Sequence, residues 1–125
     1  MNEAQTAEAL AWLDLEHSEL LLTSYQRRMT TGYELAQAEL DIAESTYGVA
    51  RTEYDLNTLG RHEGPALNHC RARLALAYAN LSKARAEFNI ECDRLKLEVQ
   101  RQALRVNYHA ALHERASDRL DNPGF

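Results

Sequence analysis

The stretch TLGRHEGPAL, residues 58–67, brings glycine and proline together in a chain that has only five glycines and two prolines among its 125 residues. Gly60 suits the position directly after a helix, where a left-handed backbone is favoured, and Pro65 suits the first turn of the next helix. The residues between them are too few for an interdomain linker and typical of a helix–helix connection. The stretch therefore predicts a turn that folds one long helix back along another.

Composition predicts helix on both sides of this turn. Apolar residues make up 45% of the chain, and Ala and Leu dominate them while Val and Ile are scarce. Ala, Leu, Arg, Glu and Gln lose little rotamer freedom in a helix, and DNPGF at 121–125 ends the second helical stretch. We expect one all-α domain, a long antiparallel two-helix coiled-coil hairpin with helices over about 3–59 and 66–120 and a turn at 60–65.

Residues 30–32 leave an alternative open. Thr30, Thr31 and Gly32 all lower helix propensity, so the chain either continues here as one kinked helix or breaks to give three helices. We favour the continuous helix, because a second helix that reaches about residue 120 needs a partner of equal length.

Apolar residues recur every seven positions on two tracks in each helical stretch. In the first stretch one track is Tyr33, Leu40, Tyr47 and Tyr54, and the other is Leu35, Ile42, Val49 and Leu56. In the second stretch one track contains Leu74, Leu81 and Phe88, and the other is Leu76, Ile90, Leu97 and Leu104, with Lys83 interrupting it. Two tracks offset by two residues lie about 200° apart on a helix of 3.6 residues per turn, so each helix has two apolar faces.

A two-helix hairpin buries only one apolar stripe per helix. The second stripe predicts a contact with another copy, giving a larger helical bundle and a homo-oligomer, or with a different protein. The alternative is that residues 2–29 fold back and cover it within one chain. The sequence does not decide which track faces inward.

If the chain folds back between residues 62 and 63, apolar residues of the first helical stretch face apolar residues of the second. The pairs are then Leu35–Ile90, Tyr47–Tyr78, Val49–Leu76 and Ala50–Ala75. Charge supports the same pairing: residues 1–59 carry 11 acidic and 3 basic side chains, whereas residues 60–125 carry 8 acidic and 11 basic ones. An acidic helix beside a basic one favours pairing within the chain over pairing of like halves.

Several classes of protein are disfavoured by the sequence. The acidic start MNEAQTAEALAW lacks the basic region of a secretory signal, and the longest apolar run, residues 74–79, is far shorter than the roughly 20 residues that span a bilayer. Cys70 and Cys92 lie too far apart on one helix for a disulfide, and two free thiols suit a reducing compartment. We expect a cytoplasmic protein, or a component of an assembled particle, without a membrane span.

No pattern of catalytic residues stands out, so we expect no enzyme and no cofactor. His109 and His113 have the i, i+4 spacing of shared metal ligands, and the predicted register places Glu16 and His17 beside them as a candidate zinc or other transition-metal site. A second weak candidate is a cysteine–histidine nucleophile formed by Cys70 with His62 or His69. Ordinary polar or apolar packing is the simpler interpretation of all these residues.

The segments ELAQAELDIAESTYGVARTEYDL and RARLALAYANLSKARAEF resemble the Ala-rich coiled-coil hairpins of bacterial efflux adaptors and outer-membrane channel proteins, over about residues 34–88. The resemblance rests on Ala- and Leu-rich repeats and implies shared hairpin packing rather than common ancestry.

Two functional hypotheses follow. The first is a non-enzymatic scaffold or structural subunit that acts through protein–protein contacts, for example in a virion. The second is a small acidic inhibitor that masks a partner's surface, for example a nucleic-acid-binding one, with the carboxylates of Glu34, Asp41, Glu44 and Asp55. Direct binding of nucleic acid by the basic second helix is disfavoured, because the chain carries a net charge of −5.

Overall fold

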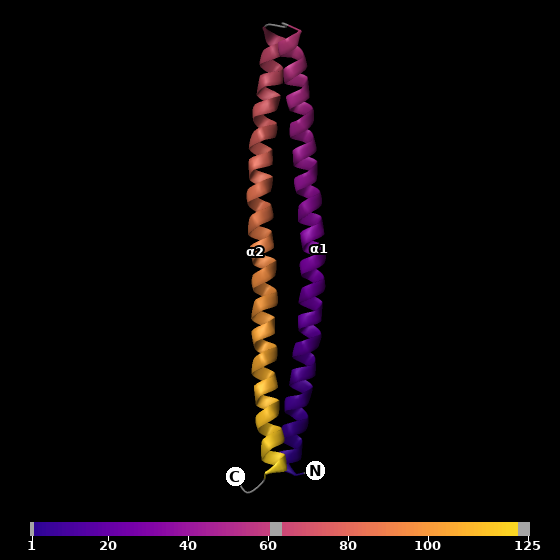
Figure 1. Ribbon diagram of the computed structural model, residues 1–125, viewed down its shortest axis with the longest axis vertical. Coiled ribbons are helices and arrows are strands. Elements are labelled where there is room, and N and C mark those ends of the chain that lie inside the picture. The colour runs from indigo at the N-terminus through magenta and orange to yellow at the C-terminus, as the bar shows by residue number, and fades with distance from the viewer. Residues whose placement is uncertain (1, 61–63, 123–125) are drawn as a thin grey trace. The chain divides into compact units, whose positions relative to one another are not determined.

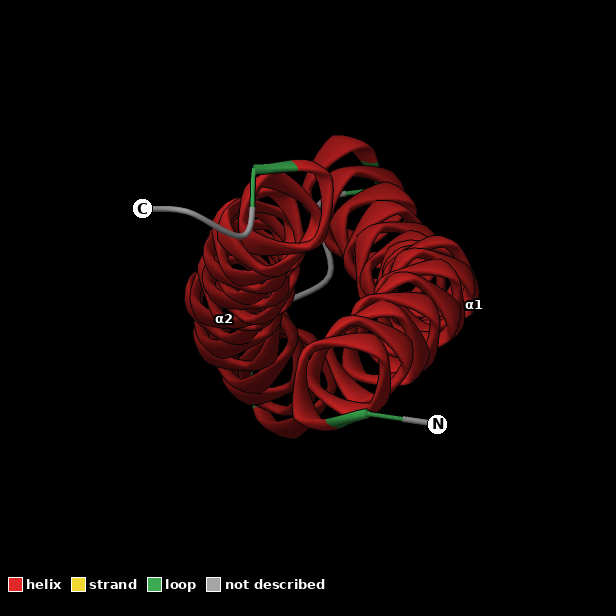
Figure 2. Ribbon diagram, turned by 90° about the horizontal axis from the view of Figure 1, so that it is seen from below, coloured by secondary structure: helices red, strands yellow, loops and turns green. Residues whose placement is uncertain are grey.

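The computed structural model describes residues 2–60 and 64–122, and in these ranges it contains two helices and no strand (Figures 1 and 2). Helix α1 spans Glu3–Leu59 and helix α2 spans Pro65–Asp121. The prediction of an all-α helical hairpin is confirmed. The three-helix alternative is wrong, since α1 continues through residues 30–32. There the Thr30 hydroxyl donates a hydrogen bond of 3.2 Å to the Gln26 carbonyl oxygen, so the polar side chain is satisfied within the helix.

Both helix starts carry local signals. Asn2 Oδ1 accepts a hydrogen bond from the Gln5 backbone N–H at 2.8 Å, and Gln5 Oε1 accepts one from the Asn2 N–H at 3.1 Å. This reciprocal capping box satisfies two backbone donors at the start of α1. Helix α2 begins at Pro65, one residue before the predicted start; proline suits this first turn because it lacks the N–H that would remain unpaired there.

The structure describes the residues on either side of the turn, Gly60 and Gly64. The Gly60 N–H donates to the Leu56 carbonyl oxygen at 2.9 Å, which is the bond expected of a residue that follows a helix end. Gly64 has a φ of 80°, a left-handed conformation that glycine adopts without strain, and it directly precedes Pro65. The remaining turn residues, 61–63, and the predicted stop at 123–125 lie outside the described residues, although α2 ends at Asp121.

The chain divides into two compact units. The hairpin-end unit comprises Gly32–Asp93, and the terminal unit comprises Met1–Thr31 together with Arg94–Phe125. Within each unit, α1 and α2 lie side by side (Figure 1). Residues 2–29 therefore pack along the second half of α2 in the terminal unit, and the alternative that they fold back over the apolar stripes of the other unit is wrong.

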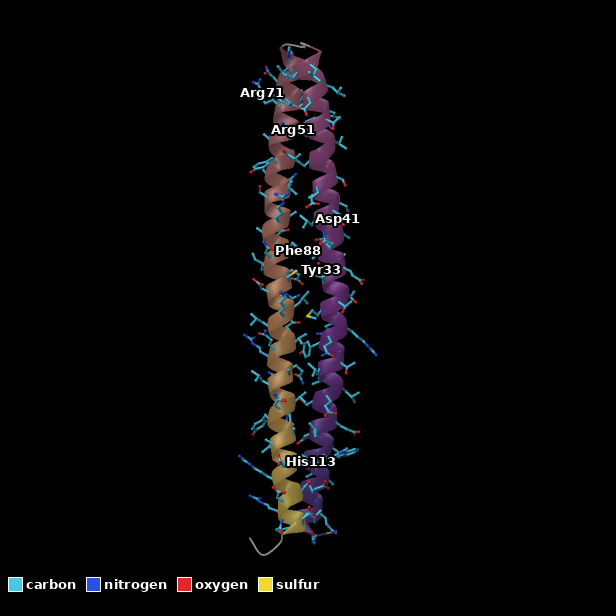
Figure 3. The ribbon with its side chains drawn as sticks, in the orientation of Figure 1. Tyr33, Asp41, Arg51, Arg71, Phe88 and His113 are labelled. Carbon is cyan, nitrogen blue, oxygen red and sulfur yellow. The ribbon has the colours of Figure 1, made fainter. Side chains whose placement is uncertain are left out.

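The core of the hairpin-end unit shows which stripe faces inward. Leu40 and Ala50 of α1 and Ala77 and Leu81 of α2 are buried. Tyr33 and Phe88 approach each other between the helices, with ring centroids 5.6 Å apart (Figure 3). The track that begins at Tyr33 is thus the intrachain seam of α1, with Ala50 beside it.

The predicted register holds in part. Tyr47 and Tyr78 face each other with ring centroids 6.0 Å apart, as predicted. Ala50, however, lies at the level of Ala77, and Ala75 is exposed. The predicted Ala50–Ala75 pair is wrong because Ala75 projects from α2 away from the seam.

Polar groups lie in the seam of the terminal unit. Gln102 and Ser18 are both buried, and Gln102 Nε2 donates to the Ser18 carbonyl oxygen at 2.9 Å and to its Oγ at 3.1 Å. Leu95 is buried in the same unit. Ser18 would face residue 107 in the predicted register, so the observed pairing is about one helical turn away.

This difference in register accompanies a change of heptad phase. The buried or half-buried residues of α1 alternate in steps of three and four on both sides of this change, but Gly32, Ala36 and Leu40 follow one another at two successive steps of four. A four-residue insertion into a seven-residue repeat is a stutter, which locally unwinds a coiled coil. A register that is extended from the turn through the hairpin-end unit therefore does not predict which residues pair in the terminal unit.

Leu81 and Leu76 form a matched pair for testing the seam. Leu81 is 3% exposed and Leu76 is 63% exposed. We expect Leu81→Ala to lower the free energy of unfolding by about 2–4 kcal/mol through loss of buried contacts and the cavity left behind, and Leu76→Ala by less than about 1 kcal/mol. Urea denaturation at low protein concentration measures both, and equal losses would contradict the assignment of the inward track.

The buried amide of Gln102 gives a second prediction. Its Oε1 accepts no hydrogen bond among the described residues. Replacing both polar partners, Ser18→Ala with Gln102→Leu, is expected to raise the free energy of unfolding by about 1 kcal/mol, whereas Gln102→Ala alone should lower it by about 2 kcal/mol. Urea denaturation tests this, and a double variant less stable than the wild type would show that the hydrogen bonds outweigh the unsatisfied oxygen.

Candidate functional site

The second apolar track of α1 lies on the outside of the hairpin-end unit. We call this track the outer stripe of α1, and its members, each between 57% and 67% exposed, are Leu35, Ile42, Val49 and Leu56. Leu40, only two residues before Ile42, is 9% exposed. The two tracks that look alike in the sequence therefore differ sharply in their contact with water.

Helix α2 carries the equivalent feature. The outer stripe of α2 in this unit consists of Leu76 and Ile90, which are 63% and 68% exposed, with Lys83 between them. In the terminal unit the same track continues with exposed Leu97 and Leu104. The predicted pair Leu35–Ile90 is thus not a buried contact.

Val49 and Leu76 lie on the same face of the hairpin-end unit. They line one shallow groove, whose floor is formed by the buried Ala50 and Ala77. The large apolar side chains of Val49 and Leu76 are exposed beside these small buried residues. This face is the most apolar candidate for binding a protein partner.

Tyrosine and arginine side chains gather in a second hollow of the hairpin-end unit. The residues around it include Tyr47, Tyr54, Tyr78, Arg51 and Arg71, and Figure 3 labels both arginines. Tyrosine and arginine are enriched where proteins bind each other.

Arg51 interacts with two side chains of its own helix. Asp55, whose Oδ1 lies 3.4 Å from Arg51 Nε, raises the pKa of Arg51, and a side-chain hydrogen bond with Tyr47 raises it further. The sequence alone does not indicate this cluster, because Tyr47 and Tyr54 stand at the heptad spacing of a packing track and Arg51 between them has no distinguishing pattern.

The candidate metal ligands are not brought together. Glu16 and His17 are exposed, whereas His113 Nε2 lies 2.8 Å from Glu8 Oε1. In the predicted register His113 would face residue 12, so its contact with Glu8 shows a displacement of about one turn in this unit. His109 is half-buried, and its Nδ1 has no hydrogen-bond partner within the described residues. In residues 2–60 and 64–122 no three His, Cys, Asp or Glu side chains form a group that could hold a metal ion.

The cysteines take part in ordinary contacts. Cys70 and Cys92 are free and half-buried, and Cys70 Sγ accepts a hydrogen bond of 3.2 Å from Asn57 Nδ2 across the two helices. His69, adjacent to Cys70, is exposed. His62 lies outside the described residues. The structure thus gives Cys70 a seam contact with α1.

One ion pair joins the two helices of the hairpin-end unit directly. Arg73 Nη1 lies 2.9 Å from Glu53 Oε2, and both side chains are partly exposed. Exposed pairs of this kind contribute about 0–1 kcal/mol each. The pair agrees with the predicted attraction between acidic α1 and basic α2. Its contribution is too small for such pairs to be the main source of stability.

Neither described helix has a stretch long and apolar enough to pass through a lipid bilayer. Comparison with protein-family models, with curated proteins and with solved structures gave no match. The outer stripes and the charges around them are therefore the observations on which a function can be argued.

Adding zinc tests whether the candidate ligands, which lie apart in the structure, bind a metal ion. We expect zinc to shift the melting temperature of the wild-type chain and of the His109→Ala/His113→Ala variant equally, because ligands that lie apart bind metal weakly and stabilise the fold little. Differential scanning calorimetry measures the two shifts. A rise of more than about 3 °C in the wild type alone would reveal a metal site.

Proposed function

We propose that this protein is a non-enzymatic structural subunit that works through contacts between copies of itself, as a scaffold or assembly component of a larger particle such as a virion. The observation that carries the proposal is the pair of outer stripes in the hairpin-end unit, where large apolar side chains remain more than half exposed.

The amount of exposed apolar surface supports association. Soluble monomers seldom leave contiguous apolar patches uncovered, and such patches usually mark interfaces. The α1 stripe alone offers four large side chains at heptad spacing. Each one that leaves water on association contributes about 1 kcal/mol or more, so that several together offset the loss of translational and rotational freedom.

The spacing of these residues indicates what kind of surface they would bind. A seven-residue repeat on a helix complements another helix with the same repeat, because each side chain inserts between side chains of the facing helix. A small ligand or a flat surface would make no use of that period. The partner is therefore helical, and a second copy of this chain provides such a helix without any further component.

A second candidate function is favoured by the carboxylates of α1. Glu34, Asp41 and Glu44 are exposed on the hairpin-end unit. An acidic strip of this kind would bind a basic surface and mask it, as expected of a small inhibitor. Its binding would weaken as salt screens the charges.

Sedimentation of variants tests the main proposal. We expect the wild-type chain to associate at micromolar concentration and the Val49→Gln/Leu76→Gln variant to associate at least about tenfold more weakly, because two apolar contacts are lost from the groove rims. Tyr78→Gln is the matched control, since Tyr78 is 58% exposed but lies in the tyrosine–arginine hollow. Circular dichroism should show unchanged helix in all three chains.

Two results would contradict this function. A wild-type chain that stays single throughout the micromolar range has no self-association to explain, and the acidic inhibitor then becomes the better proposal. A Tyr78→Gln variant that loses association as fully as the groove variant would place the interface on the tyrosine–arginine hollow instead.

A further inference from the structure

We propose that the association is heterologous: the outer surface of α1 in one copy packs against the outer surface of α2 in the next, and Lys83 selects this pairing. The inference rests on the proposed self-association and adds which surfaces meet. It is drawn from the residues of the hairpin-end unit alone.

Small side chains complete each outer stripe into a full coiled-coil seam. Between the large apolar residues, at steps of three and four, lie exposed small residues: Ala38, Ser45 and Thr52 on α1, and Ala72, Ala79 and Ala86 on α2. Alternating steps of three and four are the spacing of a and d positions in a coiled coil. Each helix of this unit therefore carries two seams, of which one is already occupied by the intrachain contact.

The two seams lie on nearly opposite sides of each helix. At 3.5 residues per turn, the centre of the outer seam is about 155° around the helix from the centre of the inner seam. A helix from another copy that packs on the centre of the outer seam lies on the side away from the intrachain partner, while the large residues Val49 and Leu76 lean toward the groove face that they share. Small residues in that seam allow the two backbones to approach closely.

Charge decides which outer seams meet. The residues that flank the outer seam of α1 are all acidic or uncharged, and the acidic ones are Glu34, Glu39, Asp41, Glu53 and Asp55. Within the hairpin-end unit α1 carries six acidic side chains and one basic one, whereas α2 carries four basic and three acidic ones. Two α1 seams would bring carboxylates together, and two α2 seams would bring lysines together. Pairing of α1 with α2 of another copy avoids both repulsions.

Lys83 occupies the seam position where this selection is strongest. Its side chain is 75% exposed, and its Nζ lies 3.8 Å from Glu87 Oε1 on the same helix. Ala84 lines one groove together with Glu39, so Lys83 lies near the level of Glu39 and Asp41 along the unit. In a row of identical copies without axial offset, Lys83 therefore meets the acidic flank of the neighbouring copy's α1.

The proposed pairing makes a prediction about size. A heterologous contact uses two different surfaces of each copy, so it continues into a closed ring or an open filament rather than stopping at two chains. The wild-type species should therefore contain more than two chains by sedimentation velocity or mass photometry. A stable species of two chains would overturn the heterologous arrangement.

Charge reversal at the two proposed contact positions tests the pairing itself. We expect Lys83→Glu alone and Asp41→Lys alone each to weaken assembly about tenfold or more, since each places like charges at every interface. An equimolar mixture of the two variants should assemble as the wild type does, because every contact between unlike chains again joins opposite charges. The combined variant Asp41→Lys/Lys83→Glu should also recover.

Matched controls are available on the same helices. Arg85→Glu and Glu44→Lys make the same charge reversals at exposed positions outside the outer seams, and both should assemble normally. Circular dichroism and urea denaturation report whether any variant loses the fold.

The outcomes separate this inference from the proposed function. A wild-type chain that never associates overturns both. A wild-type chain that associates, with Lys83→Glu and Asp41→Lys associating equally well, overturns the heterologous pairing and leaves the structural role intact. Stronger assembly of Asp41→Lys alone would indicate that two α1 surfaces meet, and stronger assembly of Lys83→Glu alone would indicate that two α2 surfaces meet.

Discussion

The structure depends on one constraint: a helix with apolar residues on two sides has only one side to offer to its partner in a two-helix hairpin. Burial of the seam formed by Leu40, Ala50, Ala77 and Leu81 satisfies half of the apolar pattern in the hairpin-end unit. The other half, on the outer stripes, remains in water. The described intrachain packing of that unit leaves these residues exposed, and exposed apolar stripes of this kind are typical of interfaces.

The sequence was sufficient for the hairpin and insufficient for its interior. Gly60 and Pro65 mark the turn because their backbone preferences are local, and the helix bounds follow from the same kind of signal. The choice between Leu40 and Ile42 as the inward residue is not local. Both are large and apolar, and the choice depends on which face of α1 meets α2. The structure buries Leu40 together with Ala77 and Leu81 and leaves Ile42 exposed.

The failed metal site has the same origin. His17 and His109 were expected at one level because the register was extrapolated from the turn over many heptads. A single change of phase, which in α1 falls between Ala36 and Leu40, displaces every later pairing by about a turn. Glu8 then meets His113, and Ser18 meets Gln102. The small residues of the outer seams in the hairpin-end unit are a different case. Their spacing is visible in the sequence, but it indicates a seam only once the large residues between them are known to be exposed.

Two polar residues interrupt apolar seams in this chain, and one is buried whereas the other is exposed. Gln102 is buried and hydrogen-bonded to Ser18, so it fixes one register of the terminal unit at the expense of an unsatisfied oxygen. Lys83 interrupts an apolar track in the same way but is exposed, with only a long contact to Glu87 on its own helix. A polar residue at a seam position lowers stability and is retained where it excludes wrong partners. For Gln102 the excluded alternatives are slipped registers of the same chain. For Lys83, which faces away from the chain, an alternative to exclude exists only if another helix packs there.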